Sequence, residues 1–416
     1  MARTRAQSAT LKLKSHSSPA TENQDTSTAR FDLELSPRPT KLDQPSKSPV
    51  VDGSSGVISC IGFWAREGKW PKEYFAPSSL DRILARRRSL SSLSRKRSAF
   101  GSDQKLRGEK SAPYGDPRYK ILLESRASFM HESDLGITKQ CEKELSSFLA
   151  SYQTVPNDTP FQDDLFKNTC RRVEDRNEDR IMRDITPLIV PPADFLSIRG
   201  AQHLNILIES INEVWSNSIP LTGSQPQPDY SLGFRCEAFN DDQLAKLSPF
   251  IGDFLGGDVS FFMATYLMYF SFLTCEVKCG TSALDLADCQ NVHSMTLAVR
   301  AVVELFRAAK CERDIHRQIL GYSISHDHRS VRIYGHYPVI DGEDTKYYRH
   351  PIRSFDFTAL DGKERWTAYR FMKNVYEHWV PLHFKRICAA IDQLPLDLEL
   401  TNEAFSSASN RITASS

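Results

Sequence analysis

Three charged residues in two separate segments have the types and spacing for metal-dependent chemistry. Glu276 and Lys278 stand two residues apart in the apolar run 272–280, and Asp229 follows Pro228 upstream. If the run is a strand, Glu276 and Lys278 share one face, roughly 6 to 7 Å apart along it. A carboxylate and an ammonium inside an apolar strand are costly unless something compensates them. A divalent cation with a phosphate is one such compensation, which makes the pair a candidate site.

The elements that must position these residues follow from hydrophobic periodicity. Residues 230–234 are predicted to form a short strand. Residues 261–279 are predicted to form a buried passage from helix to strand that contains the charged pair. Between them, residues 241–254 are expected to form a helix that Asn240 opens.

A long helix is predicted directly after the charged strand. Ser282 can cap it, and its first turns are unusually polar. The polar residues of these turns are Asp285, Asp288, Gln290, Asn291 and His293. An earlier helix is predicted over residues 204–215, with Glu209 and Glu213 on its polar side.

Further elements on both sides complete the expected fold. Helices are predicted near the start of the folded region, over residues 119–130, 141–152 and 161–170. Strands are predicted after the long helix, over residues 319–325, 331–339 and 347–357. A last helical region, 363–391, is expected to bend or divide at Pro381. This order predicts an α/β fold, in the form of a mixed α+β sheet flanked by helices.

Three short segments carry a family resemblance. They are Pro-Asp-Tyr-Ser from Pro228, Thr-Cys-Glu-Val-Lys-Cys-Gly from Thr274, and Gly-His-Tyr-Pro-Val-Ile-Asp-Gly from Gly335. Over residues 165–395 the chain resembles the PD-(D/E)XK nuclease-like superfamily. It resembles more closely a fungal family of uncharacterised domains that share these segments. The resemblance implies a mixed sheet flanked by helices, with acidic residues of adjacent strands meeting at one end.

The resemblance also implies a role for each residue that matches the superfamily motif. Asp229 and Glu276 would be ligands of Mg²⁺, and Lys278 would orient and help activate the attacking water. Some superfamily members add a Glu on the first helix and a Gln on the helix after the Lys, positions that Glu213 and Gln290 match. Mg²⁺ prefers a few carboxylates with water and phosphate oxygens, so this set is chemically coherent.

Structural alternatives exist for each of these residues. Glu276 and Lys278 form a salt bridge on a solvated strand face in one alternative, and Asp229 starts a turn after Pro228 in another. Gln290, like His293, is also consistent with a surface polar residue or a satisfied core group. The gap between the two acids is longer than is usual in the superfamily, which an inserted helix at 241–254 explains. Cys275 and Cys279, on the opposite strand face, are expected to be core thiols.

A second cluster has the residue types of a metal site. It comprises His326, Asp327, His328 and His336. Turn chemistry explains the Asp, and no further carboxylate partner is evident from the sequence. We therefore expect these residues to be exposed turn residues of a hairpin.

Charge is distributed unevenly along the 416 residues. Residues 1–110 carry more Lys and Arg than Asp and Glu, whereas the remainder is mildly acidic. An acidic body is unlike a tight, sequence-independent duplex binder, so contact with nucleic acid is expected to be local or to use the arm. The basic clusters 86–88 and 95–97 are consistent with a nuclear-import signal or with a solvated tail.

Composition also predicts the domain organisation. Residues 1–115 are expected to be a disordered basic arm, 116–195 a helical extension packed on the core, 196–395 the nuclease-like α/β domain, and 396–416 a disordered tail. Nine cysteines without a CxxC pair favour reduced thiols in nucleus or cytoplasm. The low-charge run 259–275 is expected to be buried in the protein and not to span a membrane.

These observations favour a nuclease-like domain capable of Mg²⁺-dependent phosphodiester hydrolysis of nucleic acid. Without a phosphate-cradling Gly-rich loop, no nucleotide cofactor is expected, and the sequence indicates no particular protein partner. The alternative is a catalytically inactive domain of the same fold that serves as an interaction or nucleic-acid-binding module. A third possibility is a purely structural domain, for which Lys278 would be buried beneath the helix 363–391.

Overall fold

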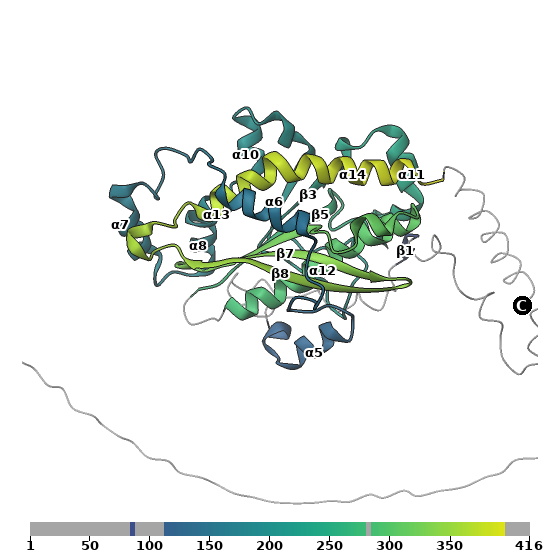
Figure 1. The fold of residues 1–416 in the computed structure, drawn as a ribbon, viewed down its shortest axis with the longest axis horizontal. Coiled ribbons are helices and arrows are strands. Elements are labelled where there is room, and N and C mark those ends of the chain that lie inside the picture. Colours follow the sequence, from purple (N-terminus) through teal and green to yellow (C-terminus); the bar gives the residue numbers. More distant parts are fainter. Residues whose placement is uncertain (1–83, 88–111, 280–283, 396–416) are drawn as a thin grey trace, which may run out of the picture. The chain divides into compact units, whose positions relative to one another are not determined.

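The structure, a computed structural model, describes residues 84–87, 112–279 and 284–395 (Figure 1). Most of the expected basic arm, the expected C-terminal tail and the predicted cap Ser282 lie outside these residues. The described residues of the arm's first basic cluster form β1 (Arg86–Arg87), which pairs with β4 (Asp258–Val259). The described residues all belong to one compact unit, Pro71–Ser416.

A six-stranded mixed sheet organises the fold, in the order β2-β3-β5-β6-β7-β8. The strands are β2 (Leu207–Ile211), β3 (Tyr230–Arg235), β5 (Met268–Val277), β6 (Gly321–His326), β7 (Ser330–Asp341) and β8 (Asp344–Asp356). Only β5 and β6 are parallel neighbours within this sheet, and the other neighbours are antiparallel. The prediction of a mixed α+β sheet with helices is therefore confirmed.

The long helix α12 (Leu284–Ala308) connects the two parallel strands. Parallel neighbours need such a crossover, because the chain must return to the other end of the sheet. The helix packs on β5, β6 and β7. Asn291 joins it to the sheet, since its side chain accepts a hydrogen bond from Thr274 Oγ1 at 2.7 Å and donates one to the Ile324 carbonyl at 2.9 Å.

The two faces of the central strands differ in chemistry. Thr274 and Glu276 of β5 alternate with Cys275 and Val277, so the two pairs point to opposite faces. The face toward α12 is therefore polar at this end of the sheet.

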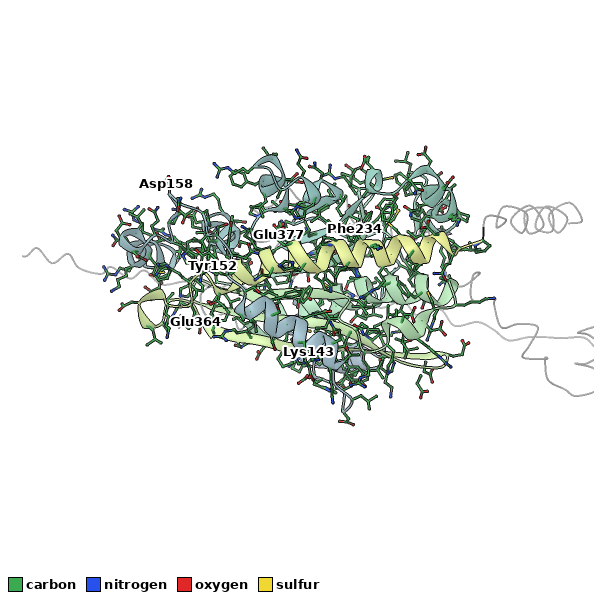
Figure 2. The ribbon with its side chains drawn as sticks, turned by 45° about the horizontal axis from the view of Figure 1, so that its top comes forward. Lys143, Tyr152, Asp158, Phe234, Glu364 and Glu377 are labelled. Atoms are coloured by element: carbon green, nitrogen blue, oxygen red, sulfur yellow. The ribbon has the colours of Figure 1, made fainter. Side chains whose placement is uncertain are left out.

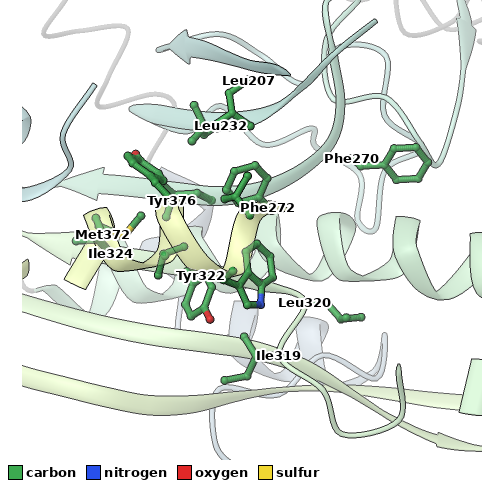
Figure 3. Packing of buried hydrophobic residues seen from close by; sticks show 14 of the residues in the cluster. Leu207, Leu232, Phe270, Phe272, Ile319, Leu320, Tyr322, Ile324, Met372 and Tyr376 are labelled. Atoms are coloured by element: carbon green, nitrogen blue, oxygen red, sulfur yellow. The ribbon is translucent and has the colours of Figure 1, made fainter. Parts of the chain in front are cut away.

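The other face packs against the C-terminal helices α13 (Thr367–Asn374) and α14 (Val380–Asp392), which a π-helical segment, Val375–Trp379, separates (Figure 1). The ring of Tyr322 lies 5.0 Å from that of Trp379, and Figure 3 shows Tyr322 among the neighbouring apolar residues of this core. The predicted bend near Pro381 is confirmed as this π-helical interruption.

Several helices precede the sheet, and all of them except α5 contribute to the same core. They are α5 (Arg118–Glu124), α6 (Lys139–Ala150), α7 (Asp163–Val173), α8 (Glu178–Asp184), α9 (Thr186–Ile189) and α10 (Ala193–Ile198). Phe148 of α6 lies edge-on to Phe371 of α13, with 6.3 Å between the rings. Figure 2 shows α6, marked by Lys143, beside the C-terminal helices. The three predicted N-terminal helices are thus present, although the first is shorter than expected.

Two sequence-based expectations about secondary structure are wrong. Residues 204–215 do not form a helix, because β2 occupies Leu207–Ile211 and pairs along its length with β3. Residues 261–267 form bends and not a helix, so β5 begins directly after them. In the first of these places cross-strand pairing outweighs local helical spacing. Among the described residues, no helix has the length and apolar character to cross a membrane.

The connection between β3 and β5 contains the predicted inserted helix, α11 (Asp241–Ile251). Asn240 and Gln243 form a capping box at its start, which satisfies main-chain N–H groups that would otherwise lack partners. This insertion accounts for the long separation of the two candidate acids.

Candidate functional site

Strand pairing brings the two candidate acids together. Tyr230 of β3 pairs with Cys275 of β5, so Asp229, one residue earlier, lies beside Glu276, one residue later. The Asp229 carboxylate also accepts a hydrogen bond from the main-chain N–H of Val277 at 2.8 Å. Asp229 therefore joins the ends of two strands and does more than start a turn.

Lys278 completes the cluster just beyond β5. Its ammonium lies 3.7 Å from Glu276 Oε2 and 4.0 Å from Asp229 Oδ2. It also donates a hydrogen bond of 2.9 Å to the Val277 carbonyl. The main-chain N–H of Lys278 is held by the His326 carbonyl on β6, at 2.9 Å. The structure thus places Asp229, Glu276 and Lys278 in one cluster, which we call the charged triad.

The charged triad is buried. Asp229, Glu276 and Lys278 are 2%, 1% and 2% exposed. The alternative of a salt bridge on a solvated strand face is therefore wrong. Charges this deep need close partners, because burial removes the water that would otherwise stabilise them.

Glu213 does not occupy the position predicted for it. It follows β2 in a loop and not on a helix, and its carboxylate accepts a hydrogen bond from Ser210 Oγ. Glu209 is on β2 itself and accepts a hydrogen bond from the Asp194 N–H at 2.8 Å. Burial, the largest cause, raises the pKa of Glu209. The predicted position of Glu213 on a helix is wrong. Its role as a metal ligand stays a prediction, which the hydrogen bond from Ser210 does not support.

Gln290 is buried on α12, and its side-chain oxygen has no hydrogen-bond partner among the described residues. His293, three residues further on, is also buried, and its Nδ1 lies 2.9 Å from the hydroxyl of Tyr114 and 3.2 Å from that of Tyr119. Burial lowers the pKa of His293 to about 3, so its ring is neutral near pH 7. His293 is a satisfied core histidine, whereas Gln290 retains an unused acceptor.

The second candidate cluster does not assemble. His326 ends β6, whereas His336 on β7 pairs with Gly321 at the opposite end of β6. Both histidines are buried and not exposed. The ring of His326 is hydrogen-bonded to Thr186 Oγ1, and that of His336 is hydrogen-bonded to Ser323 Oγ. The turn was predicted correctly, since the N–H groups of Arg329 and Ser330 donate to the Asp327 carboxylate.

Two contacts were not found from the sequence. His326 carries the carbonyl that anchors Lys278, and this contact depends on the parallel pairing of β6 with β5, which leaves no local signal in the sequence. Tyr114, in the short 3₁₀ helix Ala112–Gly115, reaches α12 from a region expected to be disordered. On the far side of β5, Cys275 is fully buried as the expected core thiol, while Cys279 is partly buried.

The described residues contain no group of three or more His, Cys, Asp or Glu side chains that could hold a metal ion. The oxygen donors that the charged triad brings together are instead two carboxylates and one main-chain carbonyl.

Fold and site together define a mixed α+β domain with a buried acid–acid–lysine cluster at the end of adjacent strands. Residues 165–391 match the model of the domain of unknown function DUF7924. Because this match spans more than half of the chain, the protein belongs to the DUF7924 family. A comparison with curated proteins gave no match.

Proposed function

We propose that this domain is a Mg²⁺-dependent phosphodiesterase that cleaves nucleic acid, built on a PD-(D/E)XK-like core. One observation carries the proposal. The ammonium of Lys278 lies among the Asp229 carboxylate, the Glu276 carboxylate and the Val277 carbonyl. In this arrangement, three oxygen donors surround a single positive group.

The same oxygen donors fit a divalent cation. Mg²⁺ is bound through one or two carboxylates and keeps further positions for water and phosphate oxygens. Here the ammonium stands where such a cation would be attracted, so Lys278 would have to withdraw from the carboxylates for the cation to enter. Asp229, Glu276 and the Val277 carbonyl would then hold it. When bound, the cation would supply Lewis-acid polarisation of a phosphoryl oxygen.

The protein's own residues have distinct roles in this proposal. Lys278, once displaced, would donate a hydrogen bond to the attacking water and stabilise the charge that develops on the phosphate. Asp229 and Glu276 would hold the cation, which would attract the phosphate to a position beside that water. Gln290, with its unused side-chain oxygen, would orient the water from α12.

The strand order supports the proposal. Two adjacent antiparallel strands, β3 and β5, present the acids, and the helix α12 crosses from β5 to a parallel neighbour. The superfamily resemblance implies this arrangement of acids at one end of a mixed sheet.

A second candidate function is an inactive domain that serves as an interaction or nucleic-acid-binding module. The burial of all three residues of the charged triad favours it, because a substrate phosphate must reach these groups. In this alternative the lysine stays between the two carboxylates permanently and holds β3 and β5 together.

A nuclease assay separates the two functions. With Mg²⁺ and single- and double-stranded DNA and RNA as substrates, we expect Glu276→Ala and Lys278→Ala to lower the cleavage rate by about 100-fold or more. Lys143→Ala, at an exposed position of α6, serves as the control and should match the wild type. Equal rates in the wild type and both triad variants, or no cleavage by any of them, would favour the inactive module.

A further inference from the structure

Residues 112–126 are attached to the rest of the domain almost entirely by side chains. Among the described residues, main-chain hydrogen bonds donated from residues 116–126 stay within the segment. The first strong main-chain link to the sheet comes at Ala127, whose carbonyl accepts from the Tyr347 N–H at 2.8 Å. A segment held in this way can detach without breaking the sheet.

Ala127 itself has a conformation suited to a hinge. Its φ is +58°, in the left-handed region that costs an alanine about 1 kcal/mol or more. After it, Ser128 forms a bridge to Tyr347 and a side-chain hydrogen bond of 2.6 Å to Thr296. The chain is thus fixed after residue 127, whereas residues 112–126 are only packed against the domain.

The packed part lies over the polar beginning of α12. Leu123 and Tyr119 of α5 pack with Cys289 and Val292 in a small apolar cluster. The Tyr119 hydroxyl lies 3.2 Å from His293 Nδ1. The outer face of the same helix is open to solvent, since Ile121 is 65% exposed.

Tyr114 extends this contact along α12 toward Gln290. Its hydroxyl lies 2.9 Å from His293 Nδ1, one helical turn from Gln290. Burial is the largest cause that raises the pKa of Tyr114, followed by its interactions with Tyr119 and Glu276. The unused oxygen of Gln290 is buried in the same region. A polar group without a partner at this depth calls for an explanation, such as a catalytic role or a bound water or ion.

We propose that residues 112–124 form a lid that closes the candidate site, and that the lid turns about Ala127 to admit a nucleic-acid phosphate. This inference rests on the proposed function. It explains how three catalytic groups can be buried in the closed protein and still meet a substrate. The closed state described here is then the inactive state of the enzyme.

Thiol labelling of the full chain tests the lid without any assay of activity. Cys289 lies under the lid, whereas Cys275 lies within the sheet, and both are buried. Burial raises the pKa of Cys289 to about 11, so it reacts slowly while covered. With N-ethylmaleimide under native conditions, read by mass spectrometry, we expect Cys289 to react about tenfold or more faster than Cys275.

Two variants sharpen the test. Leu123→Ala removes the apolar contact of the lid and should raise the Cys289 rate about tenfold, with the Cys275 rate unchanged. Ile121→Ala, on the exposed face of the same helix, should leave both rates within about twofold of the wild type. If Leu123→Ala does not fold, the labelling rates of Cys289 and Cys275 in the wild type still decide whether the lid opens.

Equal rates for Cys289 and Cys275 in the wild type would overturn the lid, because only global unfolding would then expose either thiol. Failure of the lid and failure of the proposed function give different results. Fast labelling of Cys289 with no cleavage by any variant would refute the proposed function and leave the lid in place. Mg²⁺-dependent cleavage with equal labelling would refute the lid alone.

Discussion

Replacing Lys278 with methionine is expected to lower the free energy of unfolding by about 3 to 5 kcal/mol when divalent cations are absent. The ammonium is the positive group that both buried carboxylates, Asp229 and Glu276, contact. Methionine keeps much of the side-chain volume but leaves the two negative charges facing each other. Urea denaturation in EDTA measures the change. Lys143→Met, at an exposed position, should differ from the wild type by less than about 0.5 kcal/mol.

The same variant is expected to regain stability when Mg²⁺ or Mn²⁺ is added. A cation that binds the folded state alone, at 100 times its dissociation constant, stabilises it by about 2.7 kcal/mol. The wild type should gain less, because Lys278 competes for the same oxygens. Adding Glu276→Gln to Lys278→Met should abolish the gain. A variant that is unstable and equally insensitive to both cations would contradict a metal role for the charged triad.

Acidification is expected to destabilise the protein steeply below pH 6.5. Burial lowers the pKa values of His293, His336 and His383 to about 3. Above pH 6.5 these rings are neutral in both states, so their contribution to stability is complete. As the pH falls toward 3, these three rings take up protons only in the unfolded chain. Each ring therefore lowers the free energy of unfolding by about 1.4 kcal/mol per pH unit. Urea denaturation at pH 7, 6 and 5 measures this slope.

His383 offers the clearest single test of that slope. Neither ring nitrogen has a hydrogen-bond partner among the described residues, and the ring stacks on Trp379 at 4.2 Å. His383→Phe should raise the free energy of unfolding at pH 7 by about 1 kcal/mol, since a buried polar ring without partners is replaced by an apolar one. It should also reduce the acid slope by about 1.4 kcal/mol per pH unit. An unchanged slope would show that His383 already titrates normally in the folded protein.

The pairing of Glu276 with Lys278 was predictable because strand alternation is strictly local, whereas Asp229 was assigned only through the family resemblance. A run such as 268–277 fixes which side chains share a face before any partner strand is known. Helix α11 was equally predictable, because Asn240 and Gln243 cap it within a few residues of sequence.

Features that depend on distant partners were not predictable. Residues 207–211 have spacing that suits a helix, and they form a strand because β3 pairs with them. The burial of Lys278 likewise arises from elements far away in sequence. One of them is β6, whose His326 carbonyl accepts a hydrogen bond from the main-chain N–H of Lys278. His326 and His336 were grouped by closeness in sequence, whereas the hairpin register places them at opposite ends of β6.

The most direct test of the metal site is a crystal structure of the protein grown with Mn²⁺, with anomalous scattering used to find the ion. The proposed function predicts an anomalous peak in contact with the Asp229 carboxylate, the Glu276 carboxylate and the Val277 carbonyl, with the Lys278 ammonium displaced from them. An ammonium still bridging both carboxylates at millimolar Mn²⁺, with no peak beside them, would contradict it.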